Sequence, residues 1–238
     1  MENKTILTFD MEWVPDFMIN HVVDILKKYK VKSTWFVTHN TKVLKEMRSF
    51  PDLFELGIHP NFLPNSTQGK NVEEVLKYCY EIVPEAISMR SHCLYQHTPL
   101  IAKLIKDRKI KICSNIIMPF TKNLSCFNFF WDKENILQVP IFWEDDVCLE
   151  IPNYKFTDYT FLKVNGLKVY NFHPHLVYLN SNNKKTNDNI KKRYSNYTEI
   201  KKAHLEDQIN KLDGIGKFFD YLVKYISKDK SHFMKDLL

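Results

Sequence analysis

The sequence predicts an α/β fold, and its favoured form is a barrel of about seven strand–helix units. Short apolar runs alternate with amphipathic helical patterns, which is typical of parallel strands joined by helical crossovers. Seven such runs are enough to close, or nearly close, a barrel. The composition, with 44% hydrophobic and 14% aromatic residues, suffices for a substantial core. An open, doubly wound sheet is the alternative arrangement.

The candidate strands are short runs rich in β-branched and aromatic residues, bounded by polar or turn-forming residues. Several are apolar on both faces, as expected for strands covered by helices on one side and by a core on the other. In chain order they are residues 5–10, 33–38, 54–59, 86–92, 110–116, 136–143 and 167–173.

Helical patterns fill the gaps between these runs. In residues 17–30, Met18, Val22 and Leu26 recur at helical spacing, and lysines gather toward the end of the segment. The further predicted helices are residues 40–50, 71–83 and 98–109, and a long final helix within 197–227.

One catalytic domain is predicted over residues 1–238, because there is no internal repeat and no second core pattern. Its core covers about residues 4–180. Residues 181–196 are polar and poor in apolar side chains, so they are predicted to form a mobile loop. A C-terminal helical segment follows at about 197–230, with Gly214 and Gly216 as a candidate break.

The composition bounds the location of the protein. No run of about 18 apolar residues occurs, so no transmembrane helix is predicted. The N-terminus lacks a basic segment followed by an apolar one, so we expect no secretion signal and a cytoplasmic protein. The five cysteines are odd in number and widely spaced, which favours free thiols in a reducing compartment.

The charge pattern and the glycine pattern exclude several classes of function. The net charge of +6 is spread over helices, and no basic stripe is interleaved with aromatic residues, so no nucleic-acid partner is predicted. Neither G-x-G-x-x-G nor G-x-x-x-x-G-K occurs, which argues against dinucleotide-binding and nucleotide-hydrolysing loops. The absence of G-x-S-x-G weakens a serine-esterase hypothesis.

Titratable residues follow five of the predicted strands. A single titratable residue after one strand would be only an ordinary polar strand end. In a barrel, however, the carboxyl ends of the strands converge on one face and share a pocket. Carboxylates with imidazoles are ligands for zinc, nickel, cobalt or manganese, and here they would have to come from different strands. The residues are Asp10 and Glu12, His59, Arg90 and His92, Glu144, Asp145 and Asp146, and His173 and His175.

Five segments together resemble a known family. The segments "TFDMEW", "ELGIHPNF", "MRSHCLYQ", "VPIFWEDD" and "VYNFHPHLVYLN" are similar, in this order, to the five motifs of the polysaccharide deacetylases. These are carbohydrate esterases of the NodB-homology type. The resemblance runs from about Thr8 to Asn180 and is greatest to a divergent, non-secreted, WbmS-like branch associated with bacterial surface-glycan synthesis. It implies a distorted barrel of about seven strand–helix units.

The resemblance implies roles for the groups that move protons. Asp10 matches the general base of the first motif, and Arg90 matches the arginine that pairs with that base. His173 matches the histidine that acts as general acid. In the family an aspartate of the fourth motif orients this histidine; we assign Asp145 to that role, with Asp146 as the alternative.

The resemblance also implies one divalent metal ion, with zinc first and nickel, cobalt or manganese as alternatives. Glu12 matches an acidic ligand and His59 matches the first histidine of the second motif. The second histidine of that motif is replaced by Leu63, and the proline of the third motif is replaced by His92. We therefore expect His92 to be the third protein ligand. The alternatives for this ligand are Asn61 and His175.

The implied activity is metal-dependent hydrolysis of a C–N amide bond that removes an N-acetyl or other acyl group from an amino sugar. The substrate would be an amino sugar or glycan in surface-polysaccharide biosynthesis, with a nucleotide-linked or lipid-linked form both open. Two alternatives remain: another metal-dependent amidohydrolase or phosphoesterase, or a catalytically inactive glycan-binding protein. The oligomeric state is not predicted. Candidate residues for stacking on a sugar ring are Trp13, Phe62, Trp131 and Trp143.

Overall fold

A computed structural model describes residues 3–185, 188, 197–226 and 231–238 of the chain. Most of the loop predicted at 181–196 lies outside these residues, as does the end of the predicted C-terminal helical segment at 227–230. The predicted division of the chain around that loop therefore stays a prediction.

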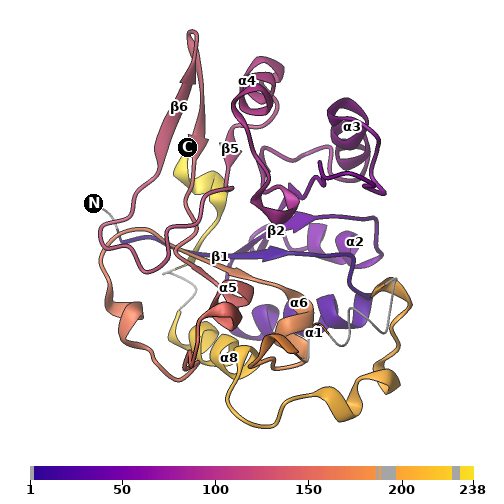
Figure 1. Cartoon of the computed structure of the whole chain (residues 1–238), viewed down its shortest axis with the longest axis vertical. Coiled ribbons are helices and arrows are strands. Elements are labelled where there is room, and N and C mark those ends of the chain that lie inside the picture. Colours follow the sequence, from indigo (N-terminus) through magenta and orange to yellow (C-terminus); the bar gives the residue numbers. More distant parts are fainter. Residues whose placement is uncertain (1–2, 186–187, 189–196, 227–230) are drawn as a thin grey trace.

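A ten-stranded mixed sheet curls through the centre of the molecule (Figure 1). Its order is β6-β7-β5-β4-β3-β2-β1-β9-β8, and β10 pairs with β1. The strands are β1 (Thr5–Asp10), β2 (Ser33–Val37), β3 (Phe54–Ile58), β4 (Ser88–Met89), β5 (Ile112–Cys113), β6 (Phe127–Trp131), β7 (Glu134–Gln138), β8 (Trp143–Glu144), β9 (Lys168–Phe172) and β10 (Ser231–His232).

The strand order is that of a distorted barrel. The first strand, β1, lies between β2 and β9, and both pairings are parallel, so the chain winds around in one direction and returns to its start. Two isolated parallel bridges, Ile117–Ile141 and Leu124–Gly166, link segments near the two ends of the sheet. The predicted barrel-type α/β fold is therefore confirmed, and the doubly wound alternative is wrong because it would reverse the strand order at a central strand.

Helices cover the outside of the sheet (Figure 1). The α-helices are α1 (Asp16–Tyr29), α2 (Val43–Arg48), α3 (Val72–Ile82), α4 (Thr98–Asp107), α5 (Asp145–Glu150), α6 (Pro174–Tyr178) and α8 (Ile215–Tyr225). The short 3₁₀ helices are η1 (His92–Leu94), η2 (Thr160–Lys163), η3 (Tyr197–Glu199), η4 (Lys202–His204), η5 (Glu206–Gln208) and η7 (Met234–Leu237).

The amphipathic pattern of α1 explains its position. Its buried residues, including Met18, Val22 and Leu26, form one face, and its end is set by Lys30 in the left-handed conformation. With this face α1 packs against α6 and α8 in the lower half of the molecule in Figure 1. The first and last α-helices thereby cover the same side of β1 and β9.

An aromatic core lies directly beneath the carboxyl ends of β1 and β9. Phe9 stacks on Trp35 with a centroid separation of 4.3 Å and on Phe172 at 5.9 Å. Phe219 of α8 meets Phe9 edge to face at 5.7 Å. Such pairs add roughly 0.5–1.5 kcal/mol each beyond their burial. This packing fixes the positions from which Asp10 and the residue after Phe172 leave the sheet.

All seven predicted strands occur, with local differences. The run at 136–143 splits into β7 and β8, because Pro140 lacks the N–H that a continuous strand would need. The antiparallel hairpin of β6 and β7, which projects at the top of Figure 1, was not predicted, and neither were β10, α5 and α6. The last two helices are only 6 and 5 residues long, too short to show a helical period.

The long helix predicted within 197–227 is wrong over its first half. Short 3₁₀ helices occupy that part, and α8 begins only after Gly214. A Cβ at Gly214 would lie 2.2 Å from the backbone oxygen of Asn180, so only glycine permits this close approach. The predicted break at Gly214 is therefore confirmed.

Two further properties concern the environment of the protein. Within the described ranges, none of the helices combines the length and the apolar character needed to cross a membrane. None of the five cysteines, which all lie in the described ranges, forms a disulfide bond; Cys79, Cys113 and Cys148 are buried, and Cys93 is exposed.

Candidate active site

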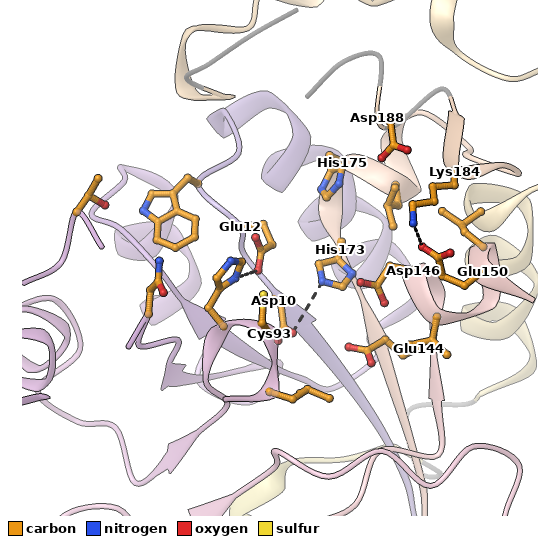
Figure 2. A pocket seen from close by; sticks show the side chains of 18 of the residues that line it. Asp10, Glu12, Cys93, Glu144, Asp146, Glu150, His173, His175, Lys184 and Asp188 are labelled. Carbon is orange, nitrogen blue, oxygen red and sulfur yellow. Dashed lines mark hydrogen bonds and ion pairs between the residues drawn. The ribbon is translucent and has the colours of Figure 1, made fainter. Parts of the chain in front are cut away.

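A pocket of about 880 Å³ opens at the carboxyl ends of the strands (Figure 2). The residues that line it come from segments after β1, β3, β4, β8 and β9, so the predicted convergence of strand ends is confirmed. The titratable residues predicted for the site that line it are Asp10, Glu12, His92, Glu144, Asp146, His173 and His175. His59, Arg90 and Asp145 are buried behind this lining.

The buried carboxylate of Asp10 is paired with an equally buried guanidinium. Arg90 is fully buried, and its Nη1 donates to Asp10 Oδ1 at 3.1 Å. Burial raises the pKa of Asp10, but the charges of Arg90, His59 and His173 outweigh it and hold the pKa below its ordinary value. Asp10 is therefore ionised at neutral pH.

Arg90 also bonds to the segment after β5, to β9 and to a second residue of β1. Its Nε donates to the backbone oxygen of Ser114 at 2.9 Å and its Nη2 donates to Ser114 Oγ at 2.7 Å. Its Nη1 donates to Thr8 Oγ1 at 2.9 Å and also to Asn171 Oδ1. The guanidinium plane lies over the ring of Phe36, 4.5 Å from its centroid. The charge is thus fully compensated inside the core.

Asn171, on β9, joins the two carboxyl groups nearest to Arg90. Because its Oδ1 accepts from Arg90, its Nδ2 must face the carboxyl groups. The two N–H bonds go to Asp10 Oδ2 at 2.9 Å and to Glu144 Oε1 at 2.7 Å. This buried amide therefore orients Asp10 from the side opposite the guanidinium.

Three residues that were predicted as metal ligands lie together. His59 Nε2 is 3.0 Å and His92 Nδ1 is 2.9 Å from the same oxygen, Oε1 of Glu12. One donor atom from each residue lies within 4.8 Å of the others. Burial raises the pKa of Glu12, but hydrogen bonds and positive charge from the two histidines hold it well below its ordinary value.

The backbone at Glu12 is bent to aim its side chain into the pocket. Glu12 and Trp13 both have left-handed φ angles, 52° and 51°. Such a conformation costs about 1–3 kcal/mol for each non-glycine residue and is found mostly where function requires it. The turn is held by the N–H of Trp13, which donates to Thr38 Oγ1 at 3.1 Å.

The three donors fit a divalent ion. His59 Nδ1 is buried, has no hydrogen-bond partner among the residues that the structure describes, and lies 3.8 Å from Asp10 Oδ1. If Nε2 of His59 binds an ion, Nδ1 must carry the proton and then faces that carboxylate, the usual support for a metal-bound histidine. Gln68 holds the segment in place, because its Nε2 donates to the backbone oxygens of His59 and Thr38.

His173 faces the pocket and is held by Asp145. The N–H of His173 donates to Asp145 Oδ2 at 2.7 Å, and the ring Nδ1 lies 2.6 Å from Oδ1. Asp146 makes no such contact and is exposed at the pocket wall. The ring Nε2 of His173 points toward Asp10 Oδ2, 3.9 Å away (Figure 2).

This environment favours the protonated imidazole. Burial lowers the pKa of His173, but the carboxylates of Asp145, Asp146 and Asp10 outweigh burial and raise the pKa well above its ordinary value. Burial raises the pKa of Asp145 to about 6, and the charge of His173 opposes this rise. At neutral pH the pair is therefore carboxylate and imidazolium.

The other predicted site residues play smaller parts in the geometry. Asn61 lines the pocket, but its Oδ1 accepts from the N–H of Leu63 in a tight turn. His175 lines the pocket with its ring centroid 5.9 Å from that of His173. In the described part of the chain, neither residue belongs to the cluster around Glu12.

Of the four aromatic residues predicted to stack on a sugar, one lines the pocket. Trp13 lies at its wall. Trp143 is fully buried, so its predicted stacking role is wrong: its ring packs on Phe172 and Phe218 in the core. Trp131 lies on the β6–β7 hairpin, outside the lining among the described residues, and Phe62 is likewise outside it.

The site residues that sequence reasoning missed are mainly neutral ones: Asn171, Gln68, Ser114 and Thr8. A buried amide or hydroxyl group in a strand carries no periodic signal. Position alone could have indicated Asn171, because it lies two residues before His173 and so belongs to the same strand end.

A family model and a solved structure both relate this chain to polysaccharide deacetylases. The family model described as WbmS-like polysaccharide deacetylase matches residues 7–191. Among solved structures, the chain is similar to a polysaccharide deacetylase involved in O-antigen biosynthesis, WbmS from Bordetella bronchiseptica. The TM-score is 0.80 and the sequence identity is 30%. The alignment covers 94% of this chain and 90% of that chain.

Two more distant structures share the fold. The Bc1960 peptidoglycan N-acetylglucosamine deacetylase has a TM-score of 0.52 at 12% identity, covering 100% of this chain and 88% of that one. The 4-α-glucanotransferase from Thermococcus litoralis has a TM-score of 0.53 at 10% identity, covering 98% and 37%. Among curated protein sequences there is no match.

We predict that removal of the buried guanidinium will destabilise the fold through Asp10. In Arg90→Met the carboxylate keeps its burial and loses its compensating charge, which costs about 3–5 kcal/mol of unfolding free energy. The double variant Arg90→Met/Asp10→Asn should recover a clear part of this loss, as measured by urea unfolding. Equal stability of the single and double variants would show that the loss comes from Ser114 and Thr8 contacts instead.

Proposed function

Because the chain belongs to the WbmS-like polysaccharide deacetylases, we propose that it is a metal-dependent deacetylase of amino sugars. It removes an N-acetyl or another acyl group during bacterial surface-polysaccharide biosynthesis. The observation that carries this proposal is the arrangement around Asp10. An ionised carboxylate lies between a carboxylate–imidazole cluster on one side and a protonated histidine on the other.

Glu12, His59 and His92 are the proposed ligands of one divalent ion. Two imidazole nitrogens and one carboxylate oxygen form a set that suits zinc, and nickel, cobalt or manganese accept the same donors. When bound by these residues, such an ion would supply Lewis-acid chemistry for the amide carbonyl and for the attacking water. Leu63 stands where the second motif of the family has a histidine ligand, and His92 is proposed to replace that ligand.

Asp10 is the proposed general base. Arg90 and Asn171 hold its two oxygens, and its lowered pKa keeps it ionised at neutral pH. A water between Asp10 and the acyl carbon would give its proton to this carboxylate as it attacks. Because water attacks directly, the reaction needs no acyl-enzyme.

His173 is the proposed general acid. Nδ1 donates to Asp145, so the second proton of the imidazolium is on Nε2, which faces the pocket beside Asp10. From there it protonates the sugar nitrogen as the C–N bond breaks. The Asp145 carboxylate keeps the ring charged until that transfer and holds its orientation.

The pocket and the family both support the proposed substrate class. A volume of about 880 Å³ accepts a sugar ring with a substituent, and the lining is rich in polar side chains that can bond hydroxyl groups. A nucleotide-linked or lipid-linked amino sugar fits a cytoplasmic enzyme, as the sequence predicts. The relationship to a deacetylase involved in O-antigen biosynthesis supports a role in a surface polysaccharide.

Acetate release from N-acetylated amino sugars, free and nucleotide-linked, tests this function. We expect turnover by the metal-loaded wild type and a fall on the order of 10²–10⁴-fold in Asp10→Asn, the range for loss of a general base. Asp24→Asn, at an exposed position on α1, is the matched control and should leave turnover unchanged. Glycan binding without release of acyl groups would favour the inactive binding protein instead.

The metal assignment is tested by metal content after loading and desalting. We expect one ion per chain in the wild type and a large loss of it in both His59→Ala and His92→Ala. His175→Ala is the control, because this histidine lines the same pocket and lies outside the ligand cluster. Full occupancy in His92→Ala would show that His92 is not the third ligand, and two ions per chain would favour another class of metal-dependent hydrolase.

The pH profile of kcat/KM tests the His173–Asp145 pair. His173 must be protonated, so activity is present below its raised pKa and falls as pH rises through it. Asp145→Asn removes the nearest carboxylate, and the alkaline limb should move to lower pH by about one unit or more. Asp146→Asn should move the limb less, because that side chain is exposed.

The matching chemical test uses the leaving group. His173→Ala should slow amide hydrolysis strongly and should slow an activated acetyl ester much less, because that leaving group needs no proton. An equal effect on both substrates would show that His173 is not the acid.

A further inference from the structure

Glu144 is a buried acidic side chain that the mechanism above leaves unused. It ends β8, is 5% exposed and lines the pocket. Figure 2 shows it below His173 and Asp146, on the side of Asp10 that is remote from Glu12. It therefore lies next to the reacting groups but outside the proposed ligand cluster.

The charges that face Glu144 come from four segments. Asp10 ends β1, Arg90 follows β4, Asp146 is on α5, and His173 follows β9. Within the described chain, the guanidinium makes its direct ion pair with Asp10, and Glu144 receives a neutral amide N–H from Asn171. Burial and the negative charges of Asp146 and Asp10 raise the pKa of Glu144 to about 8, against the positive charges of His173 and Arg90.

A second metal cation beside Glu144 would be repelled by the positive groups that surround this position. Donor atoms of Asp10, Glu144 and His173 do lie within 4.8 Å of one another. However, Asn171 directs an N–H at a carboxyl oxygen of each acid, and the imidazolium of His173 and the guanidinium of Arg90 add positive charge. A bound proton neutralises Glu144 and adds one positive charge to this position, whereas a divalent ion would add two.

We propose that Glu144 is a neutral carboxylic acid that donates a hydrogen bond to an oxygen of the substrate sugar. This inference rests on the proposed function. If the departing nitrogen lies at His173, the sugar carbon that bears it lies beside the part of the pocket wall to which Glu144 belongs, because donor atoms of His173 and Glu144 are within 4.8 Å of each other. The acceptor is then a hydroxyl or other oxygen substituent on the carbon next to the one that bears the amide.

The neutral state also protects the base. An ionised Glu144, joined to Asp10 through the amide of Asn171, would place a second buried negative charge beside the base. With a proton on Glu144, Asn171 bonds one charged acid and one neutral acid. Selectivity for an oxygen-bearing neighbour and the charge balance around the base thus depend on the same proton.

Two variants separate the possible roles of Glu144. In Glu144→Gln the side-chain oxygen still accepts from Asn171 and the NH₂ group still donates into the pocket. We expect kcat/KM at pH 7 to stay within about threefold, whereas Glu144→Ala should lose on the order of 10- to 100-fold. With a substrate analogue that lacks the neighbouring oxygen, kcat/KM should not differ in this way between Glu144→Gln and Glu144→Ala. A loss of 100-fold or more in Glu144→Gln would overturn the proposal, because a carboxylate would then be required.

A second readout needs no substrate. A folded-state pKa above the ordinary 4.5 means that the folded chain binds the extra proton, so wild-type stability falls as pH rises from about 4.5 to about 8. Glu144→Gln lacks this titration. Its melting temperature relative to that of the wild type should therefore rise between pH 5 and pH 9, by at least about 5 °C.

These measurements distinguish the possible failures. A melting difference that is constant with pH would overturn the neutral state of Glu144, whatever the activity. Loss of a second metal ion in Glu144→Gln would overturn it as well, because Glu144 would then be a ligand. A wild type that releases no acyl group overturns the proposed function and the sugar contact, while a pH-dependent melting difference would still support the proton on Glu144.

Discussion

The buried charge of Arg90 is the constraint on which the rest of the site depends. A guanidinium inside a protein costs several kcal/mol unless hydrogen bonds and an opposite charge compensate it. Here the compensation comes from β1, from β9 and from the segment after β5, through Asp10, Asn171 and Ser114. Asp10 is the acidic member of this set, so its carboxylate is held by the same contacts. The interaction that stabilises the centre of the barrel therefore also positions the proposed base.

Charge is separated across a short distance around this centre. On one side, Glu12 collects two imidazole nitrogens at a single oxygen, and on the other side Asp145 keeps His173 protonated. Asp10 lies between the two groups and contacts both at longer range, 3.8 Å to His59 and 3.9 Å to His173. Neighbouring groups with opposite protonation states are what amide hydrolysis requires at one pH, since water must lose a proton while the amine gains one.

The sequence could predict the strands and the titratable residues at their ends, because both leave local patterns. Alternation of apolar runs with helical periods identified the seven units, and the five motifs indicated Asp10, Glu12 and His173. The pattern could not choose between Asp145 and Asp146, because adjacent residues differ only in the direction that the backbone of α5 gives them. The neutral side chain of Asn171 carried no chemical signal, so only its position two residues before His173 could have indicated it. The β6–β7 hairpin was missed for a related reason: it projects from the molecule, and its pattern of exposure does not alternate.

The pairing of β1 has a consequence for how the chain acquires its structure. Thr5 and Ile6 are paired with Ser231 and His232 on one side and with Lys168 and Val169 on the other. The first strand is thus completed only by segments from the far end of the sequence. Closing such long loops costs conformational entropy before any contact repays it, and chains dominated by distant pairings fold slowly. The contacts within a helix such as α1 are local, whereas the sheet edge that carries Asp10 is built from segments far apart in the sequence. The proposed active site is therefore complete only in the fully folded chain.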